Sequence, residues 1–476
     1  MPHVASRTRP NIVLILVDDM GYGDFGCFGN PAVDTPALDA LADDGIMLTQ
    51  HYSGSAVCAP ARAALMTGRY PHRTGAIDTL DGRGLDRLAL RELTLADLLK
   101  AGGYATGLVG KWHLGNLDPR YHPTARGFDE FAGFRGGWSD YWQWRIEYNG
   151  AFQKSDGRYL TDVFTEEAVQ FIQRHRRQPF FLHVTFNAPH FPLQVPDEDA
   201  DPFRETGEFT EGVSLTYGMV RRMDKAVARI LEELERQGLS DNTVVLFTSD
   251  NGPAYFRDGY VPGVAPDPAL DYRAVRYNGD FNGSKCLVYE GGIRVPAILR
   301  WPAGLPRAER VEGLVHFTDW LPTLVAAAGA ELPKDRKLDG HDVIALLRNE
   351  TDEGDTPRFW QWNRYTPVVA FNAAMRDGPW KLVRPVVPEL LSVAQEDVAF
   401  DHRLRYDPES VTEKTDLPEP ERELPDPPAA QLFNLDTDPG EQEDLAAQHP
   451  DRLRRMQLAL ERWFEDVEAD RRSIDE

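Results

Sequence analysis

Two long apolar runs that end in acidic or amide residues most strongly constrain the fold of this chain. "NIVLILVDD" spans residues 11–19 and "TVVLFTSDN" spans residues 243–251. A continuous apolar run is typical of a strand covered on both faces, as in a parallel sheet. Two further runs, "ATGLVGKWHLG" (105–115) and "PFFLHVTFNAPH" (179–190), contain lysine or histidine near their ends. We therefore expect four buried parallel strands.

Helical apolar patterns lie between these runs, at residues 35–45, 94–103 and 217–238, and each ends in glycine. Strands that alternate with helices predict an α/β fold, because parallel strands need crossover connections. The expected fold is a large, mainly parallel central sheet sandwiched by helices.

After about residue 360, short strand patterns and turns replace the long apolar runs of the preceding sequence. Short strand patterns with turns at Asp377-Gly378 and Asp438-Pro439-Gly440 predict a smaller α+β C-terminal subdomain that contains a short antiparallel sheet. A charged amphipathic helix is expected from about His449 to the end. The predicted domains are thus a catalytic α/β domain over residues 1–360 and a C-terminal subdomain over residues 361–476.

Charge and cysteine content restrict the partners and the compartment. The net charge of −24 argues against nucleic acid and against membrane surfaces as partners. Three cysteines are too few for a disulfide framework and fit a reducing compartment. The apolar run near the N-terminus, residues 12–17, is too short for an export signal, and no run approaches a membrane span. We expect a cytoplasmic protein, and the sequence leaves its oligomeric state open.

The acidic ends of two strands predict a cation site. Asp18 and Asp19 end one strand, and Asp250 and Asn251 end another. If the strands are neighbours, three carboxylates converge, and two unit charges about 4 Å apart repel by about 4 kcal/mol at an effective dielectric constant near 20. Oxygen ligands without histidine favour Ca²⁺ or Mg²⁺ over Zn²⁺. The alternative for each pair alone is a helix cap or an Asx turn.

One of the three cysteines lies in "SAVCAPARAALMTGRYPHRTG", residues 55–75. If a helix begins near Ala59, Pro60 fits its first turn, and Arg62 shares a face with Cys58. Cys58 then lies at the positive end of the helix, a place that suits an anion. A thiolate there would be a plausible nucleophile, although a lone cysteine is most often a small core residue.

The pattern Cys-x-Pro-x-Arg, followed by Ala-Ala-Leu-Met-Thr-Gly-Arg, resembles the type I sulfatases of the alkaline phosphatase superfamily. The resemblance extends over most of the chain, through "NIVLILVDDMGYGD", "GYATGLVGKWHLG", "SDNG", "GSKCLVYEGGIRVP" and "LFNLDTDPGEQEDLA". It implies that a maturation enzyme oxidises Cys58 to formylglycine. It also implies a divalent cation, usually calcium, bound by the modified Cys58 together with Asp18, Asp19, Asp250 and Asn251.

The same resemblance implies roles for the other polar residues. Arg62 would fix the formylglycine, and Lys111 and His113 would flank it. His190 and Lys285 would contact the sulfate and the leaving oxygen. Ser139 matches, more loosely, a serine that hydrogen-bonds sulfate.

The implied reaction begins with hydration of the aldehyde to a gem-diol. One hydroxyl, made acidic by the cation, attacks sulfur in line, while Arg62, Lys111 and Lys285 stabilise charge on the sulfuryl oxygens. His190 or Lys285 protonates the departing alcohol. His113 then takes the proton of the second hydroxyl, so that sulfate leaves and the aldehyde returns.

The substrate is less constrained than the reaction. Aromatic residues in 136–148 and 358–365 would suit the faces of a sugar ring, or they pack between subdomains. We expect a small sulfated carbohydrate as the substrate, with an aryl sulfate as the alternative. A phosphonate or phosphate ester hydrolase of the same superfamily, or a non-catalytic calcium-binding protein, are further alternatives. A sulfate monoester carries a single negative charge, which suits one cation and two lysines.

Overall fold

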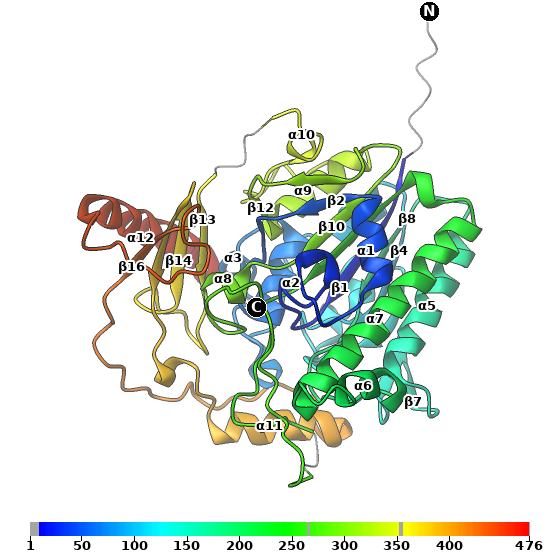
Figure 1. Ribbon diagram of the computed structural model, residues 1–476, viewed down its shortest axis with the longest axis horizontal. Coiled ribbons are helices and arrows are strands. Elements are labelled where there is room, and N and C mark those ends of the chain that lie inside the picture. Colours follow the sequence, from blue (N-terminus) through cyan, green and yellow to red (C-terminus); the bar gives the residue numbers. More distant parts are fainter. Residues whose placement is uncertain (1–8, 264–266, 352–355, 476) are drawn as a thin grey trace, which may run out of the picture.

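The computed structural model describes residues 9–263, 267–351 and 356–475. Residues 1–8, part of the segment considered above for an export signal, lie outside the described residues. A ten-stranded sheet forms the centre of the protein (Figure 1). Its order is β11 (Glu309–Val311), β2 (Ile46–Leu48), β10 (Ala297–Arg300), β9 (Thr243–Ser249), β1 (Asn11–Val17), β8 (Phe180–Thr185), β4 (Ala105–Lys111), β5 (Glu130–Phe134), β6 (Arg145–Tyr148) and β7 (Ala151–Lys154).

The five central strands, from β9 to β5, are parallel, whereas β10, β6 and β7 pair in antiparallel fashion at the sides. All four runs predicted to be buried parallel strands are therefore confirmed. All seven residues of β1 are buried, which explains why its sequence is apolar at every position.

Side chains of β1 alternate between two hydrophobic cores, as the two-residue period of a strand requires. Val13 and Ile15 face the core that includes α1 (Pro36–Asp43), α5 (Leu160–His175), α6 (Asp197–Arg204) and α7 (Glu211–Arg236). Leu14 and Leu16 face the core that includes α2 (Cys58–Thr67), α4 (Leu95–Ala101) and α9 (Phe317–Ala327). The sheet is thus sandwiched by helices, as expected.

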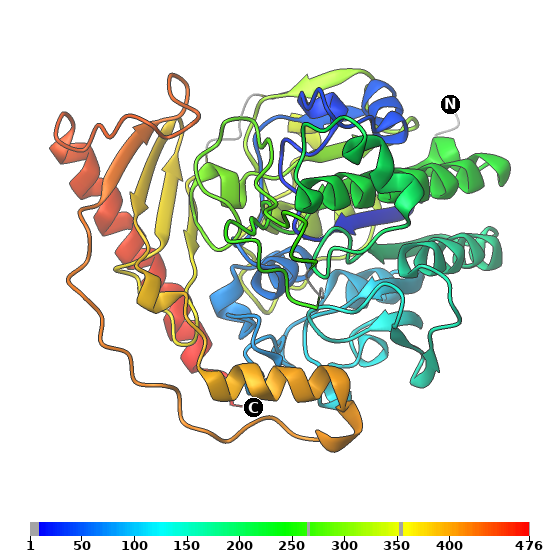
Figure 2. The ribbon, with the colours of Figure 1, turned by 60° about the horizontal axis from the view of Figure 1, so that its bottom comes forward.

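A small antiparallel sheet of four strands follows, in the order β13 (Arg358–Gln361), β14 (Ala373–Asp377), β15 (Trp380–Arg384) and β16 (Gln431–Asn434). Helix α12 (Pro450–Arg472) runs along one face of this sheet (Figure 2). Its Met456 and Leu460 pack with Met375 and Leu382 in one apolar cluster. Strand β13 spans the expected boundary at residue 360, and the division into two domains stays a prediction.

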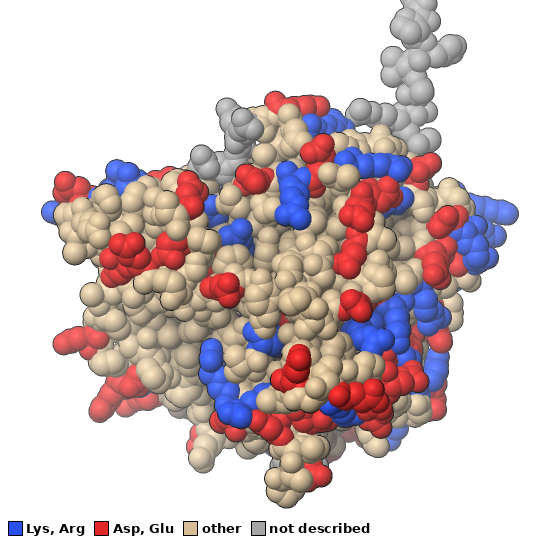
Figure 3. Space-filling model, viewed as in Figure 1, with Lys and Arg blue, Asp and Glu red and all other residues tan. Residues whose placement is uncertain are grey.

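Shorter elements complete the described chain. Strands β3 (His51–Tyr52) and β12 (Val315–His316) form a separate parallel pair. The remaining α-helices are α3 (Pro71–Thr74), α8 (Glu290–Ile293), α10 (Ile344–Leu347) and α11 (Gln395–Tyr406), and short 3-10 helices lie between the elements. Across the described residues, no helix combines the length and the apolar character that crossing a membrane requires. Acidic and basic side chains are interspersed over the face seen in Figure 3.

Candidate active site

The parallel strands β9, β1, β8 and β4 are neighbours, so their carboxyl ends meet at one edge of the sheet. Asp18 and Asp19 directly follow β1, and Asp250 and Asn251 directly follow β9. All four side chains are almost completely buried. The two strand ends that the sequence marked as acidic therefore come together.

Helix α2 begins at Cys58 and brings this residue to the same edge. Ligand atoms of Asp18, Asp19, Cys58 and His190 all lie within 4.8 Å of one another, and all four residues are buried. His190 was not expected among residues that surround a cation. Asn251 and Asp250 adjoin the group, since Asn251 Nδ2 donates to Asp19 Oδ1 at 2.8 Å and Asp250 Oδ1 accepts from the Asp19 amide at 3.3 Å.

Two oxygens at this edge are buried and lack a hydrogen-bond donor among the described residues, namely Asp18 Oδ1 and Asn251 Oδ1. Burying a polar oxygen without a partner is unfavourable. Hard oxygen ligands on carboxylate and amide groups are those that Ca²⁺ and Mg²⁺ prefer. The residues present thus fit a divalent cation.

Each of the three carboxylates also faces a cationic side chain. Lys111 Nζ lies 2.6 Å from Asp18 Oδ2, and Lys285 Nζ lies 2.7 Å from Asp19 Oδ1. Arg62 Nε donates to Asp250 Oδ2 at 2.9 Å. The guanidinium of Arg62 is held further by the carbonyl of Lys111 at 3.1 Å and by the hydroxyl of Thr185. Thr185, the last residue of β8, escaped the sequence analysis because threonine is ordinary in a strand.

Burial and neighbouring charges set the pKa values of the acidic side chains and of the cysteine at this edge of the sheet. Burial raises the pKa of Asp250 to about 6, helped by repulsion from Asp18 and opposed by Arg62. Burial would also raise the pKa of Asp19, but the charges of Lys285 and His190 bring that pKa below its ordinary value. The pKa of the Cys58 thiol rises to about 12 through burial, despite Lys111 and Lys285. An unmodified Cys58 is therefore a neutral thiol at neutral pH.

His113 follows the end of β4 and has a left-handed backbone conformation, with φ of 55°. Its Nε2 lies 3.1 Å from Asp81 Oδ1, and its buried Nδ1 has no hydrogen-bond partner among the described residues. Burial lowers the pKa of His113 to about 4, against the attraction of Asp81. The sequence analysis missed Asp81, which lies 32 residues from His113 in a glycine-containing turn without a recognisable pattern.

Ser139 lies outside this network of contacts. Its hydroxyl donates to the carbonyl of Asp140 at 3.3 Å, and the residue lines a neighbouring cavity. In the second aromatic segment, Trp360, Trp362 and Tyr365 are each only 1% exposed. These three side chains pack inside the protein, so they offer no face to a sugar.

Comparisons with known proteins identify one family over most of the chain. The family model described as Sulfatase matches residues 10–330, and the model described as N-sulphoglucosamine sulphohydrolase, C-terminal, matches residues 280–393. Steryl-sulfatase of Rattus norvegicus is 32% identical over 78% of this chain and 76% of its own length. N-acetylgalactosamine-6-sulfatase of Canis lupus familiaris is 35% identical over 74% of this chain and 72% of its own.

A solved structure shares the whole architecture. The crystal structure of Ps i-CgsB in complex with k-i-k-neocarrahexaose superposes with a TM-score of 0.77 and 31% sequence identity. The match covers 96% of this chain and 93% of that one.

Proposed function

This chain belongs to the sulfatase family and is a sulfuric ester hydrolase, and we propose that it cleaves a small sulfated carbohydrate with a formylglycine made from Cys58 and a bound divalent cation. The observation that carries the proposal is the position of Cys58 at the start of α2, with its sulfur within 4.8 Å of carboxylate oxygens of Asp18 and Asp19. A side chain at this position can bind the cation and also contact the substrate.

Asp18, Asp19, Asp250 and Asn251 would hold the cation together with the modified Cys58. Calcium is the expected ion, and magnesium is the alternative. When bound, the ion lowers the pKa of a coordinated hydroxyl and attracts the negative charge of a sulfuryl oxygen. The aldehyde at position 58 requires a maturation enzyme, which is the one protein partner that we propose.

Three cations would receive the sulfate group. Arg62, Lys111 and Lys285 all reach the acidic cluster, and their charges offset those that grow on the sulfuryl oxygens as the ester bond breaks. Arg62 is fixed by several hydrogen bonds, so it needs no reorganisation during the reaction. Ser139 remains a proposed sulfate contact.

Two histidines would move protons. His190 Nε2 lies 3.7 Å from Asp19 Oδ2, and His190 or Lys285 would donate a proton to the departing alcohol. His113 would accept the proton of the second hydroxyl at position 58. The Asp81 carboxylate accepts a hydrogen bond from His113 Nε2, which leaves Nδ1 as the basic atom.

The proposal of a carbohydrate substrate is supported by relatives. One is named for N-acetylgalactosamine 6-sulfate, and a structural neighbour was solved with a carrahexaose. Another relative is named steryl-sulfatase, and an aryl sulfate is the alternative substrate.

The decisive experiment compares turnover of nitrophenyl sulfate, nitrophenyl phosphate and a nitrophenyl phosphonate by mature protein. We expect the sulfate to be the preferred ester. Strong phosphonate hydrolysis beside negligible sulfate hydrolysis would instead indicate a phosphonate or phosphate ester hydrolase.

A further inference from the structure

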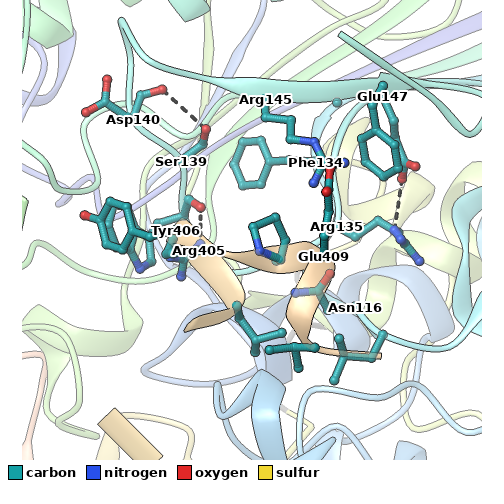
Figure 4. A pocket seen from close by; sticks show the side chains of 18 of the residues that line it. Asn116, Phe134, Arg135, Ser139, Asp140, Arg145, Glu147, Arg405, Tyr406 and Glu409 are labelled. Carbon is teal, nitrogen blue, oxygen red and sulfur yellow. Dashed lines mark hydrogen bonds and ion pairs between the residues drawn. The ribbon is translucent and has the colours of Figure 1, made fainter. Parts of the chain in front are cut away.

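A cavity of about 410 Å³ lies between the β5–β7 part of the sheet and helix α11. This volume is in the usual range for a small-molecule site. Figure 4 shows Ser139, Arg145 and Arg405 around it. Arg405 comes from the C-terminal part of the chain, whereas the other two come from the part that carries the large sheet.

The cavity adjoins the candidate active site. Asn116 lines its wall and donates to Asp81 Oδ2 at 3.2 Å, and Asp81 is the partner of His113. On another side, the ring of Trp138 lies 5.3 Å from that of Phe191, which directly follows His190. The cavity wall therefore contacts neighbours of both histidines that are proposed to move protons, Asp81 beside His113 and Phe191 beside His190, although neither histidine lines the cavity.

Arg405 is an incompletely compensated cation in the wall of the cavity. Its side chain is only 13% exposed, and its closest ion pair, to Asp401 Oδ1, is long at 3.5 Å. Its guanidinium lies 3.9 Å from the ring centre of Trp138 and donates to the carbonyl of that residue. Its Nε is buried and has no hydrogen-bond partner among the described residues.

The carboxylate of Asp81 accepts from His113, Asn116 and the amide of Gly137, and among the described residues the ion pair of Arg405 is with Asp401 instead. Burial accordingly lowers the pKa of Arg405, in spite of the charges of Asp401 and Asp81. Burying a charge without full compensation is unfavourable, and an incoming anion relieves the cost.

A second arginine, Arg145, lies in the same wall. It stacks on Phe152 at 4.0 Å, and its ion pair with Glu409 is long, at 3.6 Å, with a glutamate side chain that is 84% exposed. The third arginine, Arg135, forms an ion pair with the buried Glu147, with 3.0 Å between Arg135 Nε and Glu147 Oε1. Arg405 and Arg145 thus have longer ion pairs than Arg135, and both line a cavity in which an acidic ligand could pair with them.

We propose that this cavity holds the part of the substrate that leaves with the alcohol, and that this part is a saccharide unit bearing a second acidic group, a carboxylate or a second sulfate, bound by Arg405. This inference rests on the proposed function, since it places the sulfate ester at the cation site. Guanidinium pairs with both anions through two parallel hydrogen bonds. A neutral sterol would leave Arg405 with only its long ion pair to Asp401 and its contacts with Trp138.

Binding of desulfated products by calorimetry tests the inference without turnover. The probes are a disaccharide with a uronate unit, one with a sulfate on the second unit, and a neutral disaccharide of the same linkage. We expect wild-type protein to bind at least one acidic disaccharide about tenfold more tightly than the neutral one, the effect of one charged hydrogen bond. Equal affinities for all three would overturn the inference, and the stronger acidic probe identifies the anion.

Two variants locate the effect. The Arg405→Met variant should bind the acidic and neutral disaccharides about equally. Arg403 is an exposed arginine on the same helix, and the Arg403→Met variant should keep the preference for the acidic disaccharide. An unchanged preference in Arg405→Met would also overturn the inference. Failure of mature protein to hydrolyse any sulfate ester would count against the proposed function, while the product affinities would still decide the role of the cavity.

Discussion

The Asp81 carboxylate lies 3.1 Å from Nε2 of His113, and both side chains are almost completely buried. The contact fixes which ring nitrogen carries the proton, because a carboxylate can only accept. The remaining nitrogen, Nδ1, is left as an acceptor without a partner among the described residues. Asp81 is therefore a positioning residue for the proposed base.

Replacing Asp81 by asparagine tests this relationship. We expect Asp81→Asn to lower kcat for nitrophenyl sulfate by about 10- to 100-fold, with little change in KM, because the histidine loses the group that orients it. Asp118→Asn, at an exposed turn, serves as the control. A wild-type kcat in a folded Asp81→Asn protein would remove Asp81 from the mechanism.

Leaving groups of different basicity separate the two candidate proton donors. His190→Ala should reduce turnover of a sugar sulfate by about 10²- to 10⁴-fold, but that of nitrophenyl sulfate much less, because nitrophenolate leaves without a proton. The same comparison is made with Lys285→Met. The variant with the larger difference between substrates identifies the donor, and equal losses on both substrates in both variants would exclude the two residues as donors.

Removal of the cation should affect stability as well as activity. Buried carboxylates at the edge of the sheet repel one another, so treatment with a chelator should lower Tm and abolish turnover. Restored calcium at 100 times its Kd should stabilise the folded protein by about 2.7 kcal/mol. The Asp19→Asn variant should lose most of this calcium-dependent shift in Tm. A Tm unaffected by chelator and by calcium would contradict the proposed cation site.

A buried carboxyl outside the candidate cation site predicts a pH dependence of stability. Glu441 accepts from the amide of Glu290 at 2.7 Å and lies 2.8 Å from Lys381 Nζ. Burial raises its pKa from 4.5 to about 7, opposed by Lys381 and reinforced by Glu290. Since the folded state holds this proton more tightly, Glu441 contributes stability below pH 4.5 that is lost as the pH rises through about 7.

The free energy of unfolding contributed by protonated Glu441 is a few kcal/mol, because each unit of pKa shift corresponds to about 1.4 kcal/mol. Urea unfolding at a series of pH values between 4 and 8 measures it. Glu441→Gln should make the free energy of unfolding decline less steeply with pH than in the wild type. Parallel pH profiles for the two proteins would contradict the assignment.

Much of this architecture follows from apolar periodicity. The runs at 11–19 and 243–251 predicted two buried strands, because strands that are apolar at every position must be covered on both faces. Their adjacency was only a condition of the predicted cation site, and the parallel pairing of β1 with β9 fulfils it. Helix α7 begins six residues earlier than the pattern indicated, at Glu211, since Thr210 caps it by accepting from the Val213 amide at 3.2 Å. The polar and small residues of its first turns hid this start.

Contacts between distant segments could not be predicted in the same way. The pairing of Asp81 with His113, the hydrogen bond from Arg62 to Thr185 and the position of Arg405 in the cavity wall all depend on how loops and α11 pack after the sheet has formed. Residue types alone carry no signal of such contacts. The sulfate contact of Ser139 rests on a looser sequence match and stays a prediction; the structure shows its hydroxyl donating to the carbonyl of Asp140 at 3.3 Å.

The most direct test of the account is the chemical state of residue 58 measured together with activity. Samples produced with increasing amounts of maturation enzyme are analysed by mass spectrometry of the peptide that contains Cys58, and their kcat for nitrophenyl sulfate is determined. We predict that kcat rises in proportion to the fraction of formylglycine and that Cys58→Ala is inactive. Full turnover by Cys58→Ala, or by protein that carries only the thiol, would contradict the account.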